Sequence, residues 1–316
     1  MIILGVESTA HTFGVGIVSH TKKVLANVKD SYTSSLHGMI PEEIVQHHLR
    51  VADGVLARAL EQASVTWAGV DFIAYSAGPG IDPVLWTGHR IVTGWAKKYG
   101  KKLVGVNHCC AHLSVGMMVN SLRDPCYLYV SGVNTQVIVQ GKKKYVVMGE
   151  TLDIGLGNML DKFGRIVGLG FPAGPQIEQL ALKGKYVELP YVVKGMDVSF
   201  SGILTRIEQL YKSGKATVDD LCFSVQETCF AMVAEVVERA MAHTGKKELL
   251  LIGGVAANKR FAVMLERMCQ DRGARFTVVP MDLAGDQGAM IAWEGYLRRK
   301  TYGDIEVNPQ WRADEV

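Results

Sequence analysis

Residues 2–18 read IILGVESTAHTFGVGIV: an apolar strand, a small polar turn and a second apolar strand. The pattern returns at residues 127–139, YLYVSGVNTQVIV, where Ser, Gly and Asn again form the turn. Apolar runs of this length with such residues between them predict paired strands. The turn presents backbone N–H groups and hydroxyls, which suit phosphate oxygens. Two copies in one chain predict two similar half-domains that face a cleft.

Helices and strands alternate along the rest of the chain. The patterns predict helices over residues 41–62 and 89–99, strands over 72–76 and 102–106, and a break at 77–80 (AGPG). They also predict a helix from Thr217 to Gly245 with Asp220 completing a capping box, a strand over 248–252, and a last helix from just after Asp286 to Lys300. This alternation indicates an α/β protein with βαβ units and a largely parallel sheet.

Composition sets the class of protein. The 316 residues are 48% apolar and 21% charged, which is typical of a soluble α/β enzyme and excludes a disordered or fibrous chain. The net charge of +3 is too small to indicate nucleic-acid binding by itself. The six cysteines are scattered with no CxxC pair, which favours a reducing compartment. No apolar run approaches the roughly 20 residues of a membrane span, and the N-terminus lacks the features of a signal peptide. We therefore expect a cytoplasmic protein that is not in a membrane, with a nuclear location also open for a eukaryotic chain.

The stretch NHCCAH at residues 107–112 places two histidines four residues apart, after a predicted strand. On a helix His108 and His112 share one face and can reach one metal ion, whereas Cys109 and Cys110 point away from that face. A four-ligand zinc site within this stretch is therefore disfavoured. Histidines that only cap or pack a helix remain an equal alternative until a third ligand is named. Asp286, in the glycine-containing stretch AGDQGAM, is a candidate for that ligand and for a helix N-cap, and both roles can hold at once.

Two further stretches are candidates for nucleotide contacts. GGVAAN at residues 253–258 follows a strand and leaves room for a flat ring, with Asn258 available to a ribose or base. GFPAGP at residues 170–175 is a rigid turn with Asp161 before it and Glu178 after it. These acids can accept hydrogen bonds from sugar hydroxyls, or they can be solvent-facing helix residues. The chain has no GxSxG, HExxH or P-loop motif, which counts against a serine hydrolase, a classical zinc protease and a Walker-type ATPase.

Several long stretches together resemble one family over nearly the whole chain. They are GVESTAHTFGVGIV, VGVNHCCAH, YVSGVNTQV, GETLDIGLGNMLDKF, ELPYVVKGMDVSFSG, AHTGKKELLLIGGVAANKR and AGDQGAMIAW. The sequence is similar to the archaeal and eukaryotic catalytic subunit of the KEOPS complex, the tRNA N6-adenosine threonylcarbamoyltransferase family. The resemblance implies the actin-like ATPase fold of sugar kinases, Hsp70 and actin (ASKHA), with two similar subdomains and an interdomain cleft. We place the subdomains at residues 1–122 and 123–289, and the segment from about 290 to 316 can pack back on the first.

The family's functional residues carry over to matching positions of this chain. The implied metal ligands, for iron or zinc, are His108, His112, Tyr129 and Asp286. The implied nucleotide or substrate positions are Tyr129, Val130, Ser131, Gly132, Val133, Asn134, Asp161, Gly174, Glu178 and Asn258. Glu7 and His11 in the first turn are candidates for proton transfer or water ordering, and shaping the turn is the competing role.

By this resemblance the chain transfers threonylcarbamoyl from threonylcarbamoyl-AMP to N6 of the adenosine 3′ of a tRNA anticodon. Its implied partners are tRNA and the other KEOPS subunits: a small kinase-like ATPase, a small dimerising subunit and an accessory tRNA-binding subunit. The chain has Val133, Ala173 and Gln287 where the family usually has Gly, Gly and Asn. Val133 is β-branched and does not easily adopt a positive φ.

Two other functions remain open at this stage. One is a catalytically weakened subunit that binds nucleotide or tRNA in the same complex. The other is a small-molecule kinase of the same fold. Such kinases need a catalytic Asp near the phosphates but no HxxxH pair, so His108 and His112 count against the kinase. An assay of transfer to tRNA distinguishes the enzyme from the binding subunit.

Overall fold

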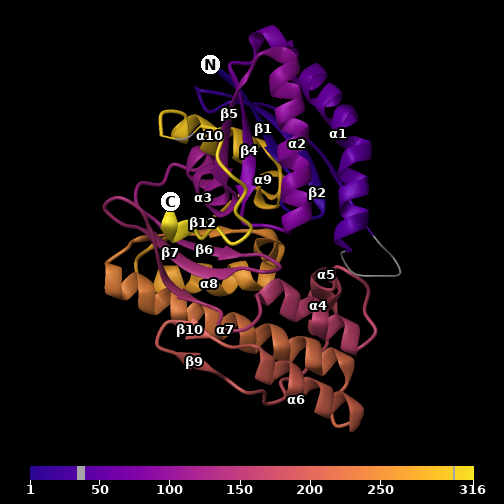
Figure 1. The fold of residues 1–316 in the computed structure, drawn as a ribbon. Helices are drawn as coiled ribbons and strands as arrows, with labels where there is room; N and C mark the ends of the chain where they lie inside the picture. Colours follow the sequence, from indigo (N-terminus) through magenta and orange to yellow (C-terminus); the bar gives the residue numbers. More distant parts are fainter. Residues whose placement is uncertain (34–39, 302) are drawn as a thin grey trace. The chain divides into compact units, whose positions relative to one another are not determined.

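The computed structural model describes residues 1–33, 40–301 and 303–316, and it divides the chain into two compact units (Figure 1). Unit 1 comprises residues 1–121 and 285–316, and unit 2 comprises residues 122–284. Residues 285–289 therefore belong to unit 1, which corrects their assignment to the second subdomain. Asp286 lies in the same unit as His108 and His112, because its segment leads into a helix that packs on the first strands.

Unit 1 is built around a five-stranded sheet in the order β3-β2-β1-β4-β5. Strands β1 and β2, and β2 and β3, pair antiparallel, while β4 is parallel to β1 and to β5. Helices α1 and α2 pack on one face, and α10, with α3 against it, packs on the other (Figure 1). The elements are β1 (Ile2–Glu7), β2 (Thr12–Ser19), β3 (Val24–Ser31), α1 (Pro41–Ala63), η1 (Trp67–Gly69), β4 (Phe72–Gly78), α2 (Asp82–Tyr99), β5 (Lys102–Asn107), α3 (His108–Val119), α10 (Gly288–Arg298) and η3 (Ala313–Glu315).

Three glycines allow α10 to lie directly on the β1–β2 hairpin. Gly5 and Gly16 are paired across the two strands. A Cβ on Gly16 would lie 2.1 Å from the backbone nitrogen of Ala289, and a Cβ on Gly5 would lie 2.3 Å from the carbonyl oxygen of Gly288. Gly288 itself has no room for a Cβ against β2. Only glycine permits this backbone approach, which places the residues before α10 beside the first turn.

Unit 2 repeats the topology of unit 1. Its sheet has the order β12-β11-β6-β7-β8, in which β6–β7–β8 are antiparallel and β11 is parallel to β6 and β12. The predicted duplication of strand-turn-strand units is therefore present as two sheets of equivalent strand order. In both, an antiparallel hairpin borders the parallel strands, so neither sheet is wholly parallel. The elements are β6 (Cys126–Val130), β7 (Thr135–Gln140), β8 (Tyr145–Glu150), α4 (Leu156–Ile166), α5 (Gly174–Ala181), β9 (Val193–Lys194), β10 (Asp197–Val198), α6 (Ser201–Lys212), α7 (Val218–Thr244), β11 (Glu248–Ile252), η2 (Gly254–Ala257), α8 (Lys259–Asp271), β12 (Arg275–Val278) and α9 (Met281–Ala284).

Helix boundaries test the local predictions. The capping box of Thr217 and Asp220 is formed at the start of α7, and Gly245 ends that helix in the left-handed conformation, as predicted. Helix α2 begins at Asp82, seven residues before its predicted start at residue 89. The reason is Pro83, which fits the first turn of a helix although it breaks an interior.

Asp153 links the end of β8 to the start of α6. Partial burial opposes its ionisation, but hydrogen bonds from Phe200, Ser199, Ser201 and Ile154 outweigh burial and hold the pKa of Asp153 below its usual range. The carboxylate thus accepts backbone N–H groups at the N-terminus of α6, where a negative charge is favourable.

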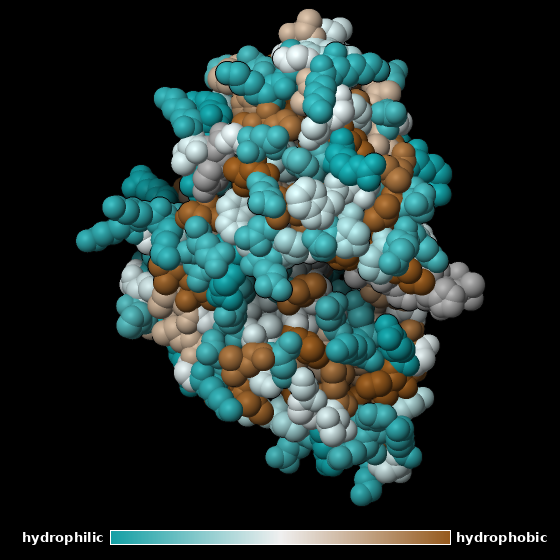
Figure 2. Space-filling view, in the orientation of Figure 1, coloured by the Kyte–Doolittle hydropathy of each residue, from teal (hydrophilic) through white to brown (hydrophobic). Residues whose placement is uncertain are grey.

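The surface and the cysteines agree with the compositional analysis. Figure 2 shows hydrophilic side chains over most of the visible face, with several small apolar areas between them. All six cysteines are buried thiols. In the described part of the chain, the helices are too short or too polar to cross a bilayer.

Candidate metal centre

The two histidines of NHCCAH lie at the start of α3. Strand β5 ends at Asn107, whose side chain accepts a hydrogen bond from Cys110 N and so caps the helix. His108 and His112 are one turn apart on α3, with ring centroids 4.7 Å from each other. Cys109 and Cys110 are buried elsewhere, and burial raises the pKa of the Cys109 thiol to about 12. The prediction that the histidines share a face without the cysteines is confirmed.

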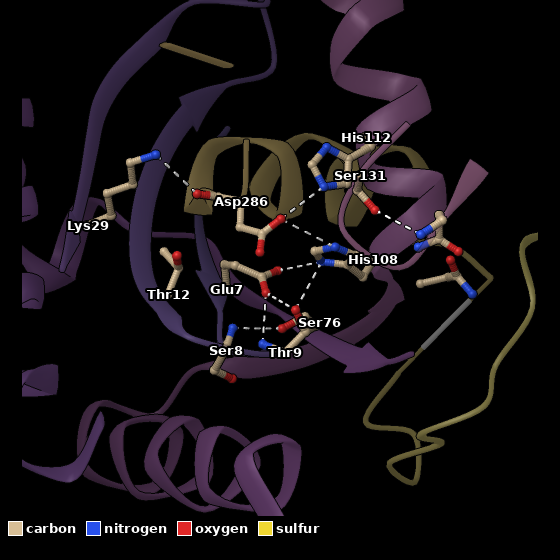
Figure 3. Close-up of polar contacts among 12 residues, drawn as sticks. Glu7, Ser8, Thr9, Thr12, Lys29, Ser76, His108, His112, Ser131 and Asp286 are labelled. Carbon is tan, nitrogen blue, oxygen red and sulfur yellow. Dashed lines mark hydrogen bonds and ion pairs between the residues drawn. The ribbon is translucent and has the colours of Figure 1, made fainter. Parts of the chain in front are cut away.

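Asp286 faces both histidines (Figure 3). Its Oδ1 lies 3.3 Å from His112 Nε2 and 3.6 Å from His108 Nε2. The N-cap of α10 is Gln287, whose side chain accepts from Met290 N, so the alternative reading of Asp286 as the N-cap is wrong. The carboxylate therefore remains available to the cluster.

Glu7 orients the His108 ring by contacting its Nδ1 atom. Its Oε2 lies 2.9 Å from His108 Nδ1, while its Oε1 accepts from Thr9 N at 2.8 Å and from the Thr9 hydroxyl (Figure 3). Because the Glu7 carboxylate accepts at Nδ1, His108 donates there and its Nε2 faces Asp286. Glu7 is fully buried and its oxygens are engaged, which favours an orienting role over proton transfer.

Electrostatics favour a compact ionic cluster. Burial alone would lower the pKa of His108, but the charge and hydrogen bond of Glu7, with the charge of Asp286, raise it to about 9. Burial lowers the pKa of His112. Burial opposes the ionisation of Asp286, yet the hydrogen bond from His112 and the charge of His108 hold its pKa below the usual range.

The donor set fits a divalent cation. His108, His112 and Asp286 each offer one ligand atom, and these atoms lie within 4.8 Å of one another. Ligands about 2.0–2.1 Å from a tetrahedral ion are separated by roughly 3.3 Å, close to the 3.3 and 3.6 Å nitrogen–oxygen distances found here. The Asp286 side chain is 23% exposed and that of His112 only 1%, so solvent reaches the cluster on the carboxylate side.

The remaining predicted ligand and the second turn lie in unit 2. Tyr129 is on β6 and is 1% exposed. In the turn, the Ser131 hydroxyl accepts from Asn134 N at 3.1 Å. Val133 is 69% exposed, and the described non-glycine residues with positive φ are Lys22 and Ser64. Val133 therefore occupies the turn without the backbone strain that its branched side chain suggested.

The acids and the amide expected to contact nucleotide already have partners within unit 2. Asp161 on α4 accepts from Ala173 N, and Glu178 on α5 accepts from Lys259 N, each at 2.8 Å. Asn258 caps α8 and donates to Gln226 Oε1 at 3.0 Å. Gly174 is the first residue of α5. Asp161 thus holds the GFPAGP turn, and Glu178 holds the residue that follows the GGVAAN stretch, so both acids are bonded rather than simply solvent-facing.

Several residues of unit 1 were not singled out by the sequence. Thr9 holds Glu7, and Ser76 Oγ accepts from Ser8 N at 3.0 Å (Figure 3). A hydroxyl residue two positions after Glu7 in a polar turn is a signal that was available. The predicted candidate His11 lies in the same turn, and its backbone carbonyl accepts a hydrogen bond from Tyr32 N at 2.8 Å.

Comparison with known proteins identifies the family. A family model described as tRNA N6-adenosine threonylcarbamoyltransferase matches residues 23–293. The chain belongs to this family. The transferase from Thermococcus kodakarensis is 52% identical, with 100% of this chain and 98% of that protein covered. The transferase from Thermofilum pendens is 48% identical over 99% of this chain and 95% of that protein. The chain also matches 58% of a probable bifunctional tRNA threonylcarbamoyladenosine biosynthesis protein of Methanosarcina mazei, at 47% identity.

Membership of the transferase family establishes threonylcarbamoyladenosine synthesis in tRNA as the function. Solved structures confirm the predicted actin-like ATPase fold. Full-length HypF in a phosphate- and nucleotide-bound form superposes with a TM-score of 0.64, at 13% identity, covering 95% of this chain and 46% of that one. Component A of Acidaminococcus fermentans (R)-2-hydroxyglutaryl-CoA dehydratase gives 0.57 over 95% of this chain and 100% of that one, also at 13% identity.

Proposed function

We propose that this transferase moves a threonylcarbamoyl group from threonylcarbamoyl-AMP to N6 of the adenosine 3′ of the anticodon, in tRNAs that read codons beginning with A. We further propose that it requires one divalent metal ion. The observation that carries the metal is the convergence of His108, His112 and Asp286 from α3 and from the segment before α10. Two imidazoles and a carboxylate accommodate iron or zinc.

We assign different roles around this ion to different residues of the chain. His108 and His112 would bind through Nε2 and Asp286 through its carboxylate. The family resemblance makes Tyr129 the proposed fourth ligand. When bound, the metal supplies a Lewis acid that polarises a carbonyl or phosphoryl oxygen. Glu7 holds His108 in the tautomer that leaves Nε2 for binding. The burial of His112 and Glu7 excludes water from the inner side of the cluster.

Nucleotide binding is the second part of the proposal. HypF was solved with phosphate and nucleotide, and a Streptomyces griseus glucokinase of similar fold, at a TM-score of 0.50, was solved with glucose and AMPPNP. We assign the adenylate to the turn from Tyr129 to Asn134 and to Asp161, Gly174, Glu178 and Asn258 of unit 2. The bonds of Asp161 to Ala173 N, of Glu178 to Lys259 N and of Asn258 to Gln226 hold these segments in place, which supports a preformed nucleotide site.

We also propose partners. The relatives from Methanosarcina species are named probable bifunctional proteins of tRNA threonylcarbamoyladenosine biosynthesis, and this chain covers 58% of their length. This supports assembly with the other KEOPS subunits: the small kinase-like ATPase, the small dimerising subunit and the accessory tRNA-binding subunit. We assign the protein to the cytoplasm, where tRNA is modified.

The test is transfer from preformed threonylcarbamoyl-AMP to tRNA, with and without the partner subunits, scoring the modified nucleoside. The His108→Ala, His112→Ala double variant should lose bound metal, measured by elemental analysis, and transfer together. His243→Ala, which removes an exposed histidine of α7, is the control and should keep both. Full transfer by a metal-free double variant would refute the metal dependence. No product from the wild-type chain in either condition would favour the nucleotide- or tRNA-binding subunit.

A further inference from the structure

The C-terminal segment, residues 303–313, has no role in the transfer reaction as described. It follows α10 and lies along β4 and β5 of unit 1 (yellow in Figure 1). On β5, Gly105 N donates to Gly303 O at 2.9 Å. On β4, Ala77 O accepts from Asn308 N at 2.8 Å. Backbone hydrogen bonds therefore fix the segment beside the two strands.

Close packing also holds the segment in this position. Val307 and Ala313 are 7% and 4% exposed. Trp311 is partly buried against the hydrophobic core of unit 1. Gly78 of β4 has a φ of +151°, and a Cβ there would lie 1.8 Å from the carbonyl oxygen of Asn308. The segment is therefore packed as part of the folded unit.

Asn107, the residue before His108, joins the segment to the start of α3. Its side chain is buried, at 1% exposed. Its Oδ1 accepts from Cys110 N at 3.0 Å and caps the helix. Because the amide oxygen faces this donor, the NH2 group faces the other way, where it donates to Trp311 O at 3.0 Å and to Arg312 O at 3.4 Å. One buried side chain thus links the helix cap to the backbone of the segment.

A second route leads from the segment to His108 through the first turn. Gly80 N donates to Pro309 O at 3.1 Å. A Cβ on Gly80 would lie 2.6 Å from Thr9 O, so the two backbones are in contact. Thr9 donates to Glu7, which in turn contacts His108 Nδ1. The segment therefore supports both the helix that carries His108 and the turn that orients its ring.

The position of His108 in α3 makes such support important. It is the first residue of the helix, and the first turn of a helix lacks backbone partners for its N–H groups and frays most easily. A metal site binds well only when its ligand atoms are already held near their final geometry. Asn107 supplies the cap of this turn, and the segment holds Asn107.

We propose that Asn107 is a positioning residue of the metal centre, and that the C-terminal segment raises metal affinity through it. With the segment attached, the first turn of α3 is fixed and His108 Nε2 faces Asp286. With the segment detached, this turn frays and the ligand atoms separate. Coupling between two sites is reciprocal, so metal binding must also stabilise the attached segment. The inference rests on the proposed metal centre, whereas the contacts of the segment do not.

Asn107→Ser separates the two functions of the side chain. Serine is a good N-cap and can still accept from Cys110 N, but it is shorter and has no NH2 group for the segment. We expect zinc affinity, measured by competition with a chromophoric chelator on metal-stripped protein, to fall about tenfold. Asn120→Ser is the control, because Asn120 donates to Gly116 O at 2.9 Å at the other end of α3. This control should keep wild-type affinity.

The reciprocal effect is tested by hydrogen exchange of the wild-type chain, which needs no variant to fold. The Asn308 amide, bonded to Ala77 O, reports attachment of the segment. Zinc should slow its exchange about tenfold, the same factor as the change in affinity. In Asn107→Ser most of this protection should disappear. The Gly141 amide, bonded to Lys144 O in unit 2, should exchange equally with and without zinc.

Transfer to tRNA provides a third measurement. Asn107→Ser should lose transfer at limiting zinc and regain it as zinc is raised, with KM for tRNA unchanged. The reason is that the substitution weakens assembly of the site and removes no group that contacts substrate. A general structural defect would persist at saturating zinc.

Wild-type zinc affinity in a folded Asn107→Ser variant overturns the inference, and so does exchange of the Asn308 amide that zinc leaves unchanged. Loss of transfer that excess zinc does not restore reduces Asn107 to a structural residue and also overturns it. A wild-type chain that binds neither zinc nor iron refutes the metal centre and the inference with it. A wild-type chain that binds zinc but transfers nothing refutes the proposed reaction alone, and the affinity and exchange measurements then decide the role of the segment.

Discussion

Replacing Glu7 by glutamine tests whether the metal centre depends on the residue behind His108. The carboxylate accepts two hydrogen bonds from Thr9 on one oxygen and one from His108 on the other. The side-chain amide of the Glu7→Gln variant has only one oxygen. If that oxygen keeps the two hydrogen bonds from Thr9, the NH2 group of the glutamine faces His108 Nδ1. His108 Nδ1 must then accept a hydrogen bond instead of donating one. The neutral ring consequently carries its proton on Nε2, the atom that faces Asp286.

This tautomer competes directly with metal binding. Loss of an outer hydrogen-bond partner of a histidine ligand typically costs about 10- to 100-fold in metal affinity. That range corresponds to about 1.4–2.7 kcal/mol. We expect Glu7→Gln to weaken zinc or ferrous iron binding by this factor, measured by competition with a chromophoric chelator on metal-stripped protein.

The control is Glu294→Gln in α10. Glu294 is buried like Glu7, at 2% against 0% exposed, but its carboxylate pairs with Arg298 at 2.9 Å on its own helix. The Glu294→Gln variant should therefore keep the metal affinity of the wild type. Loss of an outer partner is expected to cost about tenfold or more in metal affinity. A folded Glu7→Gln variant whose metal affinity stays within about twofold of the wild type, by the same measure, would therefore refute the orienting role of Glu7. A wild-type chain that binds neither metal would refute the centre itself.

Three further predictions concern stability. Gly16→Ala should lose about 3 kcal/mol or more of unfolding free energy in urea titrations, because its Cβ would lie 2.1 Å from backbone of α10. Gly54→Ala in α1, where a Cβ meets nothing within 4 Å, should gain about 0.5–1 kcal/mol, and equal effects at the two sites would contradict the close approach. Asp153→Ala should cost about 2 kcal/mol at neutral pH. The pKa of Asp153 is depressed in the folded protein, so the stabilisation by its carboxylate is fully present above the ordinary pKa of 3.8. This stabilisation is lost as the pH falls through the lower folded pKa, so the unfolding free energies of the variant and the wild type should converge in acid. A difference that persists at low pH would exclude the ionised carboxylate as the cause.

Local features were predictable because neighbouring residues decide them. The capping box at Thr217 and the glycine end at Gly245 are satisfied within one turn of helix, and both are formed. The start of α2 was misplaced because Pro83 has opposite meanings in the first turn and in the interior of a helix. By residue type Asp286 is the expected N-cap of α10, and only the backbone geometry shows that Gln287 caps the helix instead.

By itself the sequence determined the duplicated strand-turn-strand units and the common face of His108 and His112, since both follow from the periods of strands and helices. Tertiary structure decided which carboxylates meet those histidines. Glu7 is 101 residues from His108, and Asp286 is 174 residues from His112. Glu7 meets His108 because β1 and β5 lie in one sheet on either side of β4. Asp286 meets His112 because α10 packs against Gly5 and Gly16 of the first hairpin, a contact between distant backbones that no local pattern encodes.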